Sequence, residues 1–372
     1  MRHLRFHHRL LLIAAAVLTA CRTIPDVEPP VEPPRPVVHA EILRWKNGAE
    51  AAVSITFDDS TLDHYLLAAP ELDRRGMAAT FFVITGLMDG GVWHDGPVER
   101  QLFSWSQARE LAERGHEIGS HTHSHPDLTR LEPFLAERQL VRSYQRIRRE
   151  IPNQGGLTFA WPYWRSNDRT QLAASRYYIA ARGGQATTPR YLHAGSIEAR
   201  PDNMLDVNAL GMLPRETLET WHEAAEDLLQ HGGWGVLSLH GIDDGRIPHG
   251  ALGWEPLHIE VYRRILDYLR AEDIWVAPFG SVVKYIERRD TTRLTVSTNG
   301  AEISIDVDSP LDPRIYDVPL TVALRFDGSP RNMQLELAPE LRRVTLDVSA
   351  TGPVVVSTEP NQSAALTVAL RE

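Results

Sequence analysis

Residues 51–59 read AAVSITFDD, an apolar run that ends in two adjacent aspartates. A run of this length predicts a buried β-strand over 51–57, with Asp58 and Asp59 at its carboxyl end. After a stretch with helical spacing, residues 79–84 (ATFFVI) predict a second buried strand. Strand, helix and strand in this order are typical of a parallel sheet, where the carboxyl ends of the strands meet at one edge.

The same alternation continues over about 240 residues. Ser104 and Gln107 form a predicted capping box, and Gly115 is placed to end the helix that they begin. Further strands are predicted at 157–161, 177–181, 235–239 and 274–277, and further helices at 215–230 and 257–269. This alternation predicts an α/β fold over residues 41–288, either a β/α barrel or a related parallel sheet.

After the last of these strands the pattern changes, and short runs alternate with period two. Residues 294–298 and 301–307 flank Asn299-Gly300, the strongest short hairpin signal. More strands are predicted at 320–326, 333–337, 344–348, 354–357 and 366–370. Residues 289–372 are therefore predicted to form a small β-sandwich. Packing against the barrel and carbohydrate binding are both open as its role.

The chain begins with a positively charged segment, residues 1–9, followed by an apolar run at 10–20. The run is far shorter than the ~20 residues that a membrane span needs, so it predicts the core of a signal peptide. Cys21 is the only cysteine in the chain, and it follows LTA at 18–20, which resembles a bacterial lipobox. Residues 1–21 are therefore predicted to be a lipoprotein signal peptide, with lipid attached to Cys21.

By resemblance to lipoprotein sorting rules, the non-acidic Arg22 favours the outer membrane, with the protein facing the periplasm or the cell surface. The Pro-rich residues 22–40 predict an extended, semi-rigid tether. The formal net charge of −10 argues against nucleic acid and anionic membrane surfaces as partners, so membrane contact is expected only through the lipid. Hydrophobic residues at 42% and charged residues at 24% are typical of globular proteins.

Polar clusters follow three of the predicted strands: Asp58 with Asp59, HTHSH at 121–125, and His240. Each cluster alone has a structural alternative, since aspartates often cap helices, a histidine run can be an exposed surface, and a lone histidine is usually structural. Together the clusters offer imidazole and carboxylate groups, and rings four residues apart can converge on one ion. Two imidazoles and one carboxylate would leave open positions for water and substrate, as in a catalytic metal site.

Four ordered motifs resemble those of polysaccharide deacetylases, carbohydrate esterase family four. They are TFDD at 56–59, HTHSH at 121–125, FAWPYW at 159–164 and LSLH at 237–240. The resemblance covers roughly residues 45–285 and implies a distorted (β/α)7 barrel. Some positions depart from it: Ser60 and Trp164 stand where many members have glycine, and Ala160 where they have arginine. The FA-aromatic-PY form resembles a recognised subgroup with an arginine further on, for which Arg182 is the candidate.

The resemblance implies roles for the residues of the polar clusters. Asp58 is expected to be the general base. Asp59, His121 and His125 are expected to hold the metal. His240 is expected to be the general acid.

The resemblance also implies the surroundings of these groups. The backbone N–H of Tyr163 is expected to help form the oxyanion hole. Leu237 and Leu239 are expected to line the acetyl pocket. Independently of the resemblance, the large side chain of Trp164 is expected to reshape the substrate pocket. Trp254, in the long loop after the fourth motif, is expected to roof the acetyl site, and a packed tryptophan in a covering loop is the alternative.

The implied cofactor is a divalent metal, with Zn²⁺ favoured over Co²⁺, Mn²⁺ or Ni²⁺. The implied reaction is hydrolysis of an acetyl group on an oligo- or polysaccharide, with water as co-substrate. N-acetyl groups of an amino-sugar oligomer or of cell-wall glycan are favoured. An O-acetyl esterase acting on a xylan-like polysaccharide is one alternative. A non-catalytic saccharide-binding lipoprotein is another, and the intact ligand and acid–base residues argue against it.

Overall fold

A computed structural model describes residues 38–183, 199–212, 214, 218–300, 302–327, 332–347, 355–358 and 366–371. The predicted signal peptide, the lipid anchor at Cys21 and residues 22–37 of the predicted tether lie outside these ranges. Among the described helices, none combines the length and the apolar character that crossing a membrane requires.

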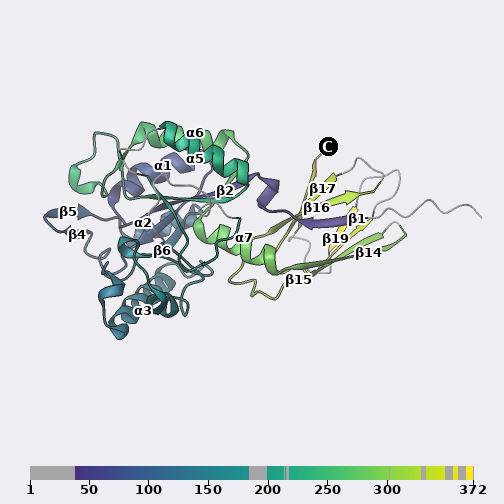
Figure 1. Cartoon of the computed structure of the whole chain (residues 1–372), viewed down its shortest axis with the longest axis horizontal. Coiled ribbons are helices and arrows are strands. Elements are labelled where there is room, and N and C mark those ends of the chain that lie inside the picture. The colour runs from purple at the N-terminus through teal and green to yellow at the C-terminus, as the bar shows by residue number, and fades with distance from the viewer. Residues whose placement is uncertain are drawn as a thin grey trace, which may run out of the picture. The chain divides into compact units, whose positions relative to one another are not determined.

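The centre of the fold is a parallel sheet in which β2 (Ala51–Phe57) lies between β3 and β10 (Figure 1). Every residue of β2 is buried, as expected for an apolar strand that is covered on both faces. Within the described ranges the strand order is β8-β7-β6-β3-β2-β10-β9, and β13 also pairs with β2. The bounds are β3 Thr80–Val83, β6 Glu117–Ser120, β7 Thr158–Ala160, β8 Ala180–Arg182, β9 Leu210–Gly211, β10 Trp234–Leu239 and β13 Ile274–Val276.

One short segment joins the two edges of this sheet. Val207 forms a parallel bridge with Arg182 of β8. Leu210 pairs in parallel with Leu237 of β10. Because β8 and β10 lie toward opposite ends of the strand order, residues 207–211 close the sheet into a barrel. The predicted fold class, a distorted α/β barrel followed by an all-β region, is confirmed.

Helices surround the barrel strands (Figure 1). They are the π-helical turn η2 His64–Ala68, then α1 Ala69–Asp73, α2 Trp105–Glu113, α3 Pro133–Glu150, α4 Asp168–Ala174, α5 Leu218–His231 and α6 Ile259–Ala271. The predicted capping box at the start of α2 is present, because Ser104 and Gln107 each accept the other's backbone N–H. Gly115 follows α2 in the left-handed conformation, with φ 92°. The sequence prediction does not include α3, although its buried residues Leu140 and Ile147 follow helical spacing.

Helix α7 (Phe279–Thr291), also absent from the prediction, closes the amino-terminal end of the barrel. Phe279 is fully buried among residues of the barrel interior, and its N–H donates to Thr80 Oγ1 at 2.8 Å. The buried carboxylate of Glu117 accepts the N–H of Gly280 at 2.8 Å and the Thr80 hydroxyl at 2.7 Å. Since Thr80 and Glu117 begin β3 and β6, α7 covers the end of the barrel opposite to the carboxyl ends of the strands.

The all-β region consists, in the part of the chain that the structure describes, of two antiparallel sheets around one shared hydrophobic core. Their strand orders are β1-β16-β17-β20 and β14-β15-β18-β19. The bounds are β14 Arg293–Asn299, β15 Glu302–Asp308, β16 Leu320–Phe326, β17 Asn332–Leu337, β18 Arg343–Asp347, β19 Val355–Thr358 and β20 Leu366–Arg371. The predicted hairpin at Asn299-Gly300 joins β14 to β15, with Gly300 at φ 63°.

Strand β1 (Val38–Ile42) belongs to this sandwich, although it precedes the barrel in the sequence. It pairs antiparallel with β16, from Val38 opposite Phe326 to Ile42 opposite Val322. The predicted tether at 22–40 therefore overlaps β1. The predicted barrel boundaries also differ from the elements, because residue 41 lies within β1 and α7 runs past residue 288. A single five-residue strand beside a Pro-rich segment gave no periodic signal long enough to separate it from the tether.

Short elements lie near the carboxyl ends of the barrel strands. The hairpin β4 (Val92–Asp95) and β5 (Val98–Gln101) precedes α2. The short parallel pair β11 (Ile242–Asp243) and β12 (Leu257–His258) brackets the loop that follows β10. The remaining single turns are η1 Lys46–Gly48, η3 Leu128–Arg130, η4 Pro162–Trp164 and η6 His249–Ala251.

Candidate active site

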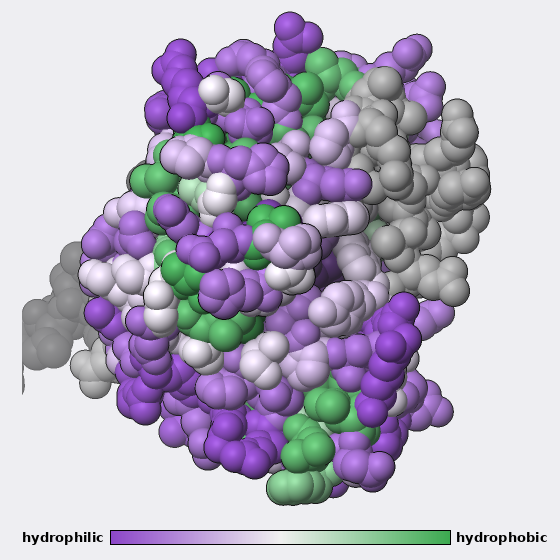
Figure 2. Space-filling view, turned by 90° about the vertical axis from the view of Figure 1, so that its left-hand side faces the viewer, coloured by the Kyte–Doolittle hydropathy of each residue, from purple (hydrophilic) through white to green (hydrophobic). Residues whose placement is uncertain are grey.

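The polar clusters at the three strand ends converge on one pocket at the carboxyl end of the barrel. Asp58 and Asp59 follow β2, His121 and His125 follow β6, and His240 follows β10. The pocket has a volume of about 410 Å³ and is lined by Asp58, Asp59, Trp93, Asp95, His121, His125, Tyr163, Trp164, His240 and Trp254. The face of the molecule that carries β4 and β5 is mainly hydrophilic and is hollowed near its centre (Figure 2).

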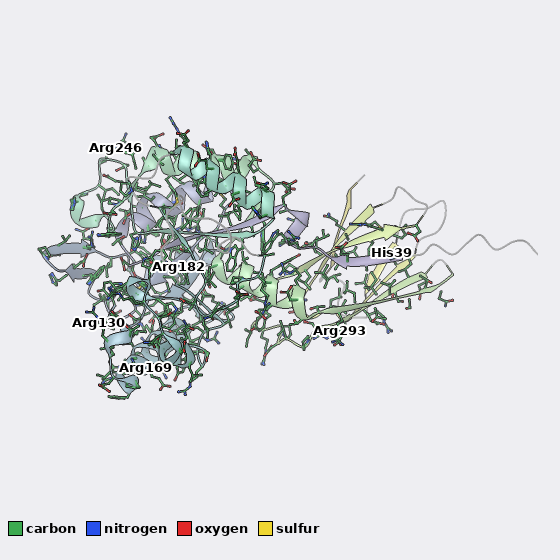
Figure 3. The ribbon with its side chains drawn as sticks, in the orientation of Figure 1. His39, Arg130, Arg169, Arg182, Arg246 and Arg293 are labelled. Atoms are coloured by element: carbon green, nitrogen blue, oxygen red, sulfur yellow. The ribbon has the colours of Figure 1, made fainter. Side chains whose placement is uncertain are left out.

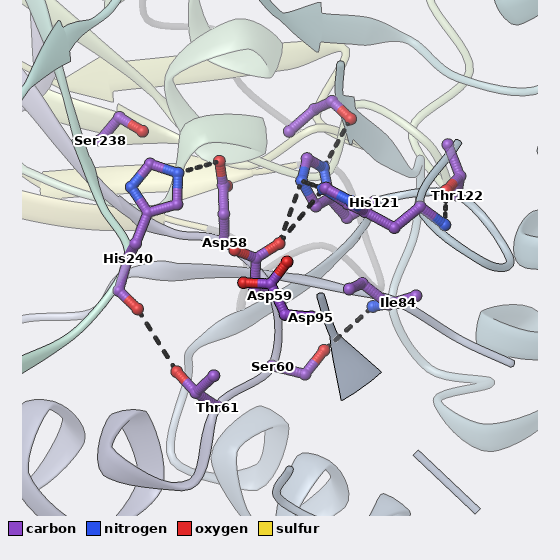
Figure 4. A network of polar contacts seen from close by, with 12 residues as sticks. Asp58, Asp59, Ser60, Thr61, Ile84, Asp95, His121, Thr122, Ser238 and His240 are labelled. Carbon is purple, nitrogen blue, oxygen red and sulfur yellow. Dashed lines mark hydrogen bonds and ion pairs between the residues drawn. The ribbon is translucent and has the colours of Figure 1, made fainter. Parts of the chain in front are cut away.

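Asp59, His121 and His125 direct their ligand atoms to one point. Asp59 Oδ1 lies 3.5 Å from His121 Nε2 and 3.3 Å from His125 Nε2. The two Nε2 atoms are 3.2 Å apart. Figure 4 shows Asp59 and His121 joined in this network, with Asp58 and His240 beside them. Within the described residues this is the single group of three such side chains that could hold a metal ion.

Hydrogen bonding and burial leave both imidazoles available as ligands. His121 Nδ1 lies 2.8 Å from the carbonyl oxygen of Ala160, so Nδ1 carries the proton and Nε2 keeps its lone pair. Burial is the largest influence on both rings, and it lowers the pKa of His121 to about 3 and the pKa of His125 to about 4. Both rings are therefore neutral near pH 7, the form that binds a metal.

A buried atom without a partner supports a cation at this point. Asp59 Oδ1, one of the converging atoms, is buried and has no hydrogen-bond partner among the described residues. Burial raises the pKa of Asp59 to about 7, although His240 acts in the opposite direction. A divalent cation would supply the missing positive charge. One carboxylate and two neutral imidazoles suit Zn²⁺ and related metals, so these residues fit the implied cofactor.

Arg182 holds Asp58 in its ionised form. Arg182 Nη2 donates to Asp58 Oδ2, and Nη1 donates to Ser238 Oγ at 3.0 Å. Arg182 is 1% exposed and lies within the barrel (Figure 3). Burial alone would raise the pKa of Asp58, but Arg182 and the neighbouring imidazoles lower it to about 2. The family resemblance expects an arginine at position 160, but this position is Ala160. Ala160 on β7 pairs with Arg182 on β8, so the guanidinium reaches Asp58 from the neighbouring strand.

His240 is fixed beside Asp58 by contacts to its backbone and its ring. Its Nε2 lies 3.8 Å from Asp58 Oδ2. The His240 carbonyl oxygen accepts from Thr61 Oγ1 at 3.3 Å, and His64 Nε2 lies 3.0 Å from the same oxygen. The rings of His240 and Trp254 meet edge to face, with centroids 5.2 Å apart. These contacts position the imidazole at the pocket without covering it.

The backbone at this site is strained. Left-handed φ values occur at Asp59, Ser60, Thr122, His125, Tyr163 and Trp164. Such values are uncommon in residues other than glycine, and they gather at functional sites. Ser60, with φ 63°, replaces an expected glycine, and its hydroxyl accepts the N–H of Ile84 at 3.0 Å. Trp164, with φ 60°, replaces another, and its ring lies 4.6 Å from the Arg182 guanidinium.

Two residues that were expected to line the acetyl pocket lie elsewhere. Leu237 and Leu239 are buried in the core cluster that packs beneath the outer helices, and they are not among the residues that line the pocket. The alternation of side chains along β10 is the reason. Ser238, between the two leucines, bonds to Arg182 in the barrel interior, so its neighbours point outward.

The other predicted pocket residues, Tyr163, Trp164 and Trp254, do line the pocket. Trp93 and Asp95 line it as well, and the sequence analysis missed both. The Asp95-Gly96 sequence is a hairpin signal that could have predicted the turn after β4, but it does not place that hairpin at the pocket.

Residues 46–181 match the family model described as polysaccharide deacetylase. The matched segment contains Asp58 and the three residues that fit a metal. Over these residues the chain is similar to polysaccharide deacetylases. The match to the deacetylase model ends just before Arg182, and His240 lies beyond it.

Curated proteins similar to this chain include the chitooligosaccharide deacetylase of Rhizobium leguminosarum bv. phaseoli. It is 29% identical over 130 residues, which cover 34% of this chain and 49% of the relative. Gellan lyase of a Bacillus species is 26% identical over 305 residues, which cover 78% of this chain but 12% of that protein. The chain thus spans half or less of the length of these relatives.

Solved structures similar to this chain include a Streptococcus pyogenes deacetylase in complex with acetate. It is 27% identical, with 46% of this chain and 69% of that chain covered and a TM-score of 0.39.

Proposed function

We propose that this chain is a metal-dependent hydrolase that removes acetyl groups from an acetylated saccharide. Its main substrates are N-acetyl groups of an amino-sugar oligomer or of cell-wall glycan. The observation that carries the proposal is the buried Asp58–Arg182 pair beside the convergent Asp59, His121 and His125. The saccharide rests on the family match and on relatives such as the chitooligosaccharide deacetylase.

Asp59, His121 and His125 would hold the metal. With a divalent ion held there, these residues would supply Lewis-acid chemistry for the acetyl carbonyl and for the attacking water. Three protein ligands leave coordination positions open for water and substrate. Zn²⁺ is favoured, and Co²⁺, Mn²⁺ and Ni²⁺ suit the same donor set.

The chain's own residues move the protons. Asp58 Oδ1 is buried and has no hydrogen-bond partner among the described residues, so it can accept a proton from the attacking water. Arg182 orients Asp58 through its other oxygen. The backbone N–H of Tyr163, in a left-handed turn at the pocket, donates to the oxyanion. His240 then protonates the departing nitrogen or oxygen.

Acetate release from three substrates tests the proposal: N-acetylated chito-oligosaccharides, peptidoglycan and acetylated xylan, each incubated with metal-loaded protein. We expect the fastest release from one of the N-acetylated substrates. Faster release from xylan would replace the proposal with an O-acetyl esterase, since the same proton path serves both leaving groups. No release from any substrate, with metal bound, would indicate a saccharide-binding protein.

We also propose that the chain is exported and anchored to the outer membrane by lipid on Cys21. The support is the LTA sequence before Cys21 at the end of the apolar run. Cys21→Ser is expected to move the protein from the membrane fraction to the soluble fraction of cells that express it. A variant that stays in the membrane fraction would contradict the anchor.

A further inference from the structure

The β4–β5 hairpin and the residues just after it contact the metal-binding triad at two places, beside Asp59 and at His125. Phe103, just after the hairpin, donates its N–H to the carbonyl oxygen of Ser60 at 3.0 Å, and Ser60 directly follows Asp59. Trp93 packs edge to face against His125, with ring centroids 5.1 Å apart. Because these contacts reach the ligands and their neighbours, the position of the hairpin is fixed relative to the reacting groups.

The loop between β11 and β12 is tied to His240 in a similar way. A Cβ atom on Gly253 would lie 1.4 Å from the His240 carbonyl oxygen, so the two backbones pack directly on each other. The next residue, Trp254, places its ring against the His240 imidazole. Trp254 is nevertheless 46% exposed, so much of its indole remains open at the pocket.

Arg100 joins the hairpin to this loop. Its buried guanidinium donates from Nε to Asp95 Oδ2 at 3.1 Å and from Nη1 to the Leu252 carbonyl oxygen at 2.8 Å. The Asp95 side chain lines the pocket and is 37% exposed. Arg100 binds the Oδ2 atom of Asp95, which leaves Oδ1 for a ligand. The side chain of Arg100 therefore positions both Asp95 and the segment before Trp254 at the rim of the pocket.

We propose that Asp95 and Trp254 form a saccharide-binding subsite for a sugar ring beside the acetyl group. The exposed part of the Trp254 indole can pack on the apolar face of a pyranose, and the carboxylate oxygen of Asp95 accepts from sugar hydroxyls. A pocket with aromatic walls and a few placed polar groups is typical of small-ligand recognition. The identity of the ligand rests on the proposed function, but the two residues lie outside the four sequence motifs.

Calorimetric titration with N-acetylated chitotetraose and with acetylated xylotetraose tests the subsite. The parent is metal-loaded Asp58→Asn protein, so that the ligand is not consumed. Adding Asp95→Asn or Trp254→Ala is expected to raise Kd about tenfold for the saccharide that the parent binds, whereas Trp254→Phe retains most of the affinity. The control is Glu99→Gln on the same hairpin, whose side chain is 66% exposed, and it is expected to leave Kd unchanged.

An unchanged Kd in both Asp95→Asn and Trp254→Ala would overturn the subsite, as would a parent that binds neither saccharide. A thermal midpoint that falls together with affinity in all three pocket variants would also overturn it, because the loops would then be merely structural. Failure of the proposed function looks different: wild-type protein would bind saccharide through this subsite and release no acetate.

Discussion

Arg182 reaches Asp58 from the strand beside the one that carries Ala160. Ala160 removes the arginine that the resemblance expects, and the paired position on the adjacent strand supplies one instead. The side chain reaches the same carboxylate, Asp58, and stacks on Trp164, which occupies an expected glycine position. The two departures from the motif are thus physically linked at the level of single residues.

Arg182→Met is expected to lower acetate release at least about 100-fold, because Asp58 loses the contact that keeps it ionised and oriented. Arg182→Lys is expected to retain part of the wild-type rate. The double variant Ala160→Arg with Arg182→Ala is expected to retain more than Arg182→Lys does, because positions 160 and 182 are register partners on neighbouring strands. The rates are measured with metal content checked for each variant. Wild-type activity in Arg182→Met would remove Arg182 from the mechanism.

Elements with a strong local signal were predictable, and those defined by distant partners were not. The continuous apolar sequence of β2 predicted its bounds, and the capping box predicted the start of α2. Strand β1 is a strand because it pairs with β16, far along the chain. The four motifs predicted the residues that converge at the pocket, whereas Trp93 and Asp95 reach it through the packing of a hairpin.

Glu71 links α1 to α6. Its carboxylate accepts from Arg263 at 2.7 Å and 2.9 Å and from Arg75 at 2.8 Å. Burial acts to raise the pKa of Glu71, but the hydrogen bonds from arginine outweigh it and lower the pKa from 4.5 to about 2. The stabilisation from these bonds is therefore present above pH 4.5 and is lost as the pH falls toward 2.

Glu71→Gln is expected to lower the free energy of unfolding by about 2 kcal/mol from pH 7 down to about pH 5, and by progressively less below pH 4.5. Urea unfolding of both proteins between pH 7 and pH 3 measures the difference. Glu260→Gln, which removes a more exposed partner of Arg263, should change stability by less than about 0.5 kcal/mol. A Glu71→Gln effect that is as large at pH 3 as at pH 7, or larger, would contradict the assignment.

At the scale of the whole molecule, barrel and sandwich share contacts at several points. Strand β1 enters the sandwich before the chain builds the barrel. On α7, Lys284 Nζ donates to Asp317 Oδ1 at 2.9 Å, and Arg288 donates to the Val318 carbonyl oxygen. A division of the chain between residues 288 and 289 would therefore separate elements that pack together.

A chain that begins at residue 43 is expected to melt roughly 5 °C below one that begins at residue 38. The shorter chain lacks β1, so it leaves the edge of β16 unpaired and removes Val38 from the sandwich core. Scanning calorimetry of both proteins gives the two midpoints. Equal midpoints would show that β1 contributes nothing to the stability of the sandwich.

The central claim is that Asp59, His121 and His125 hold a metal beside Asp58, which acts as the general base. The most direct test strips the protein with a chelator, adds Zn²⁺, and measures bound metal and acetate release together. Wild-type protein is expected to bind one equivalent and to regain activity. Asp58→Asn should bind the metal and stay inactive, and Asp59→Asn should bind it at least about 100-fold more weakly. Equal metal binding by all three proteins would contradict the claim.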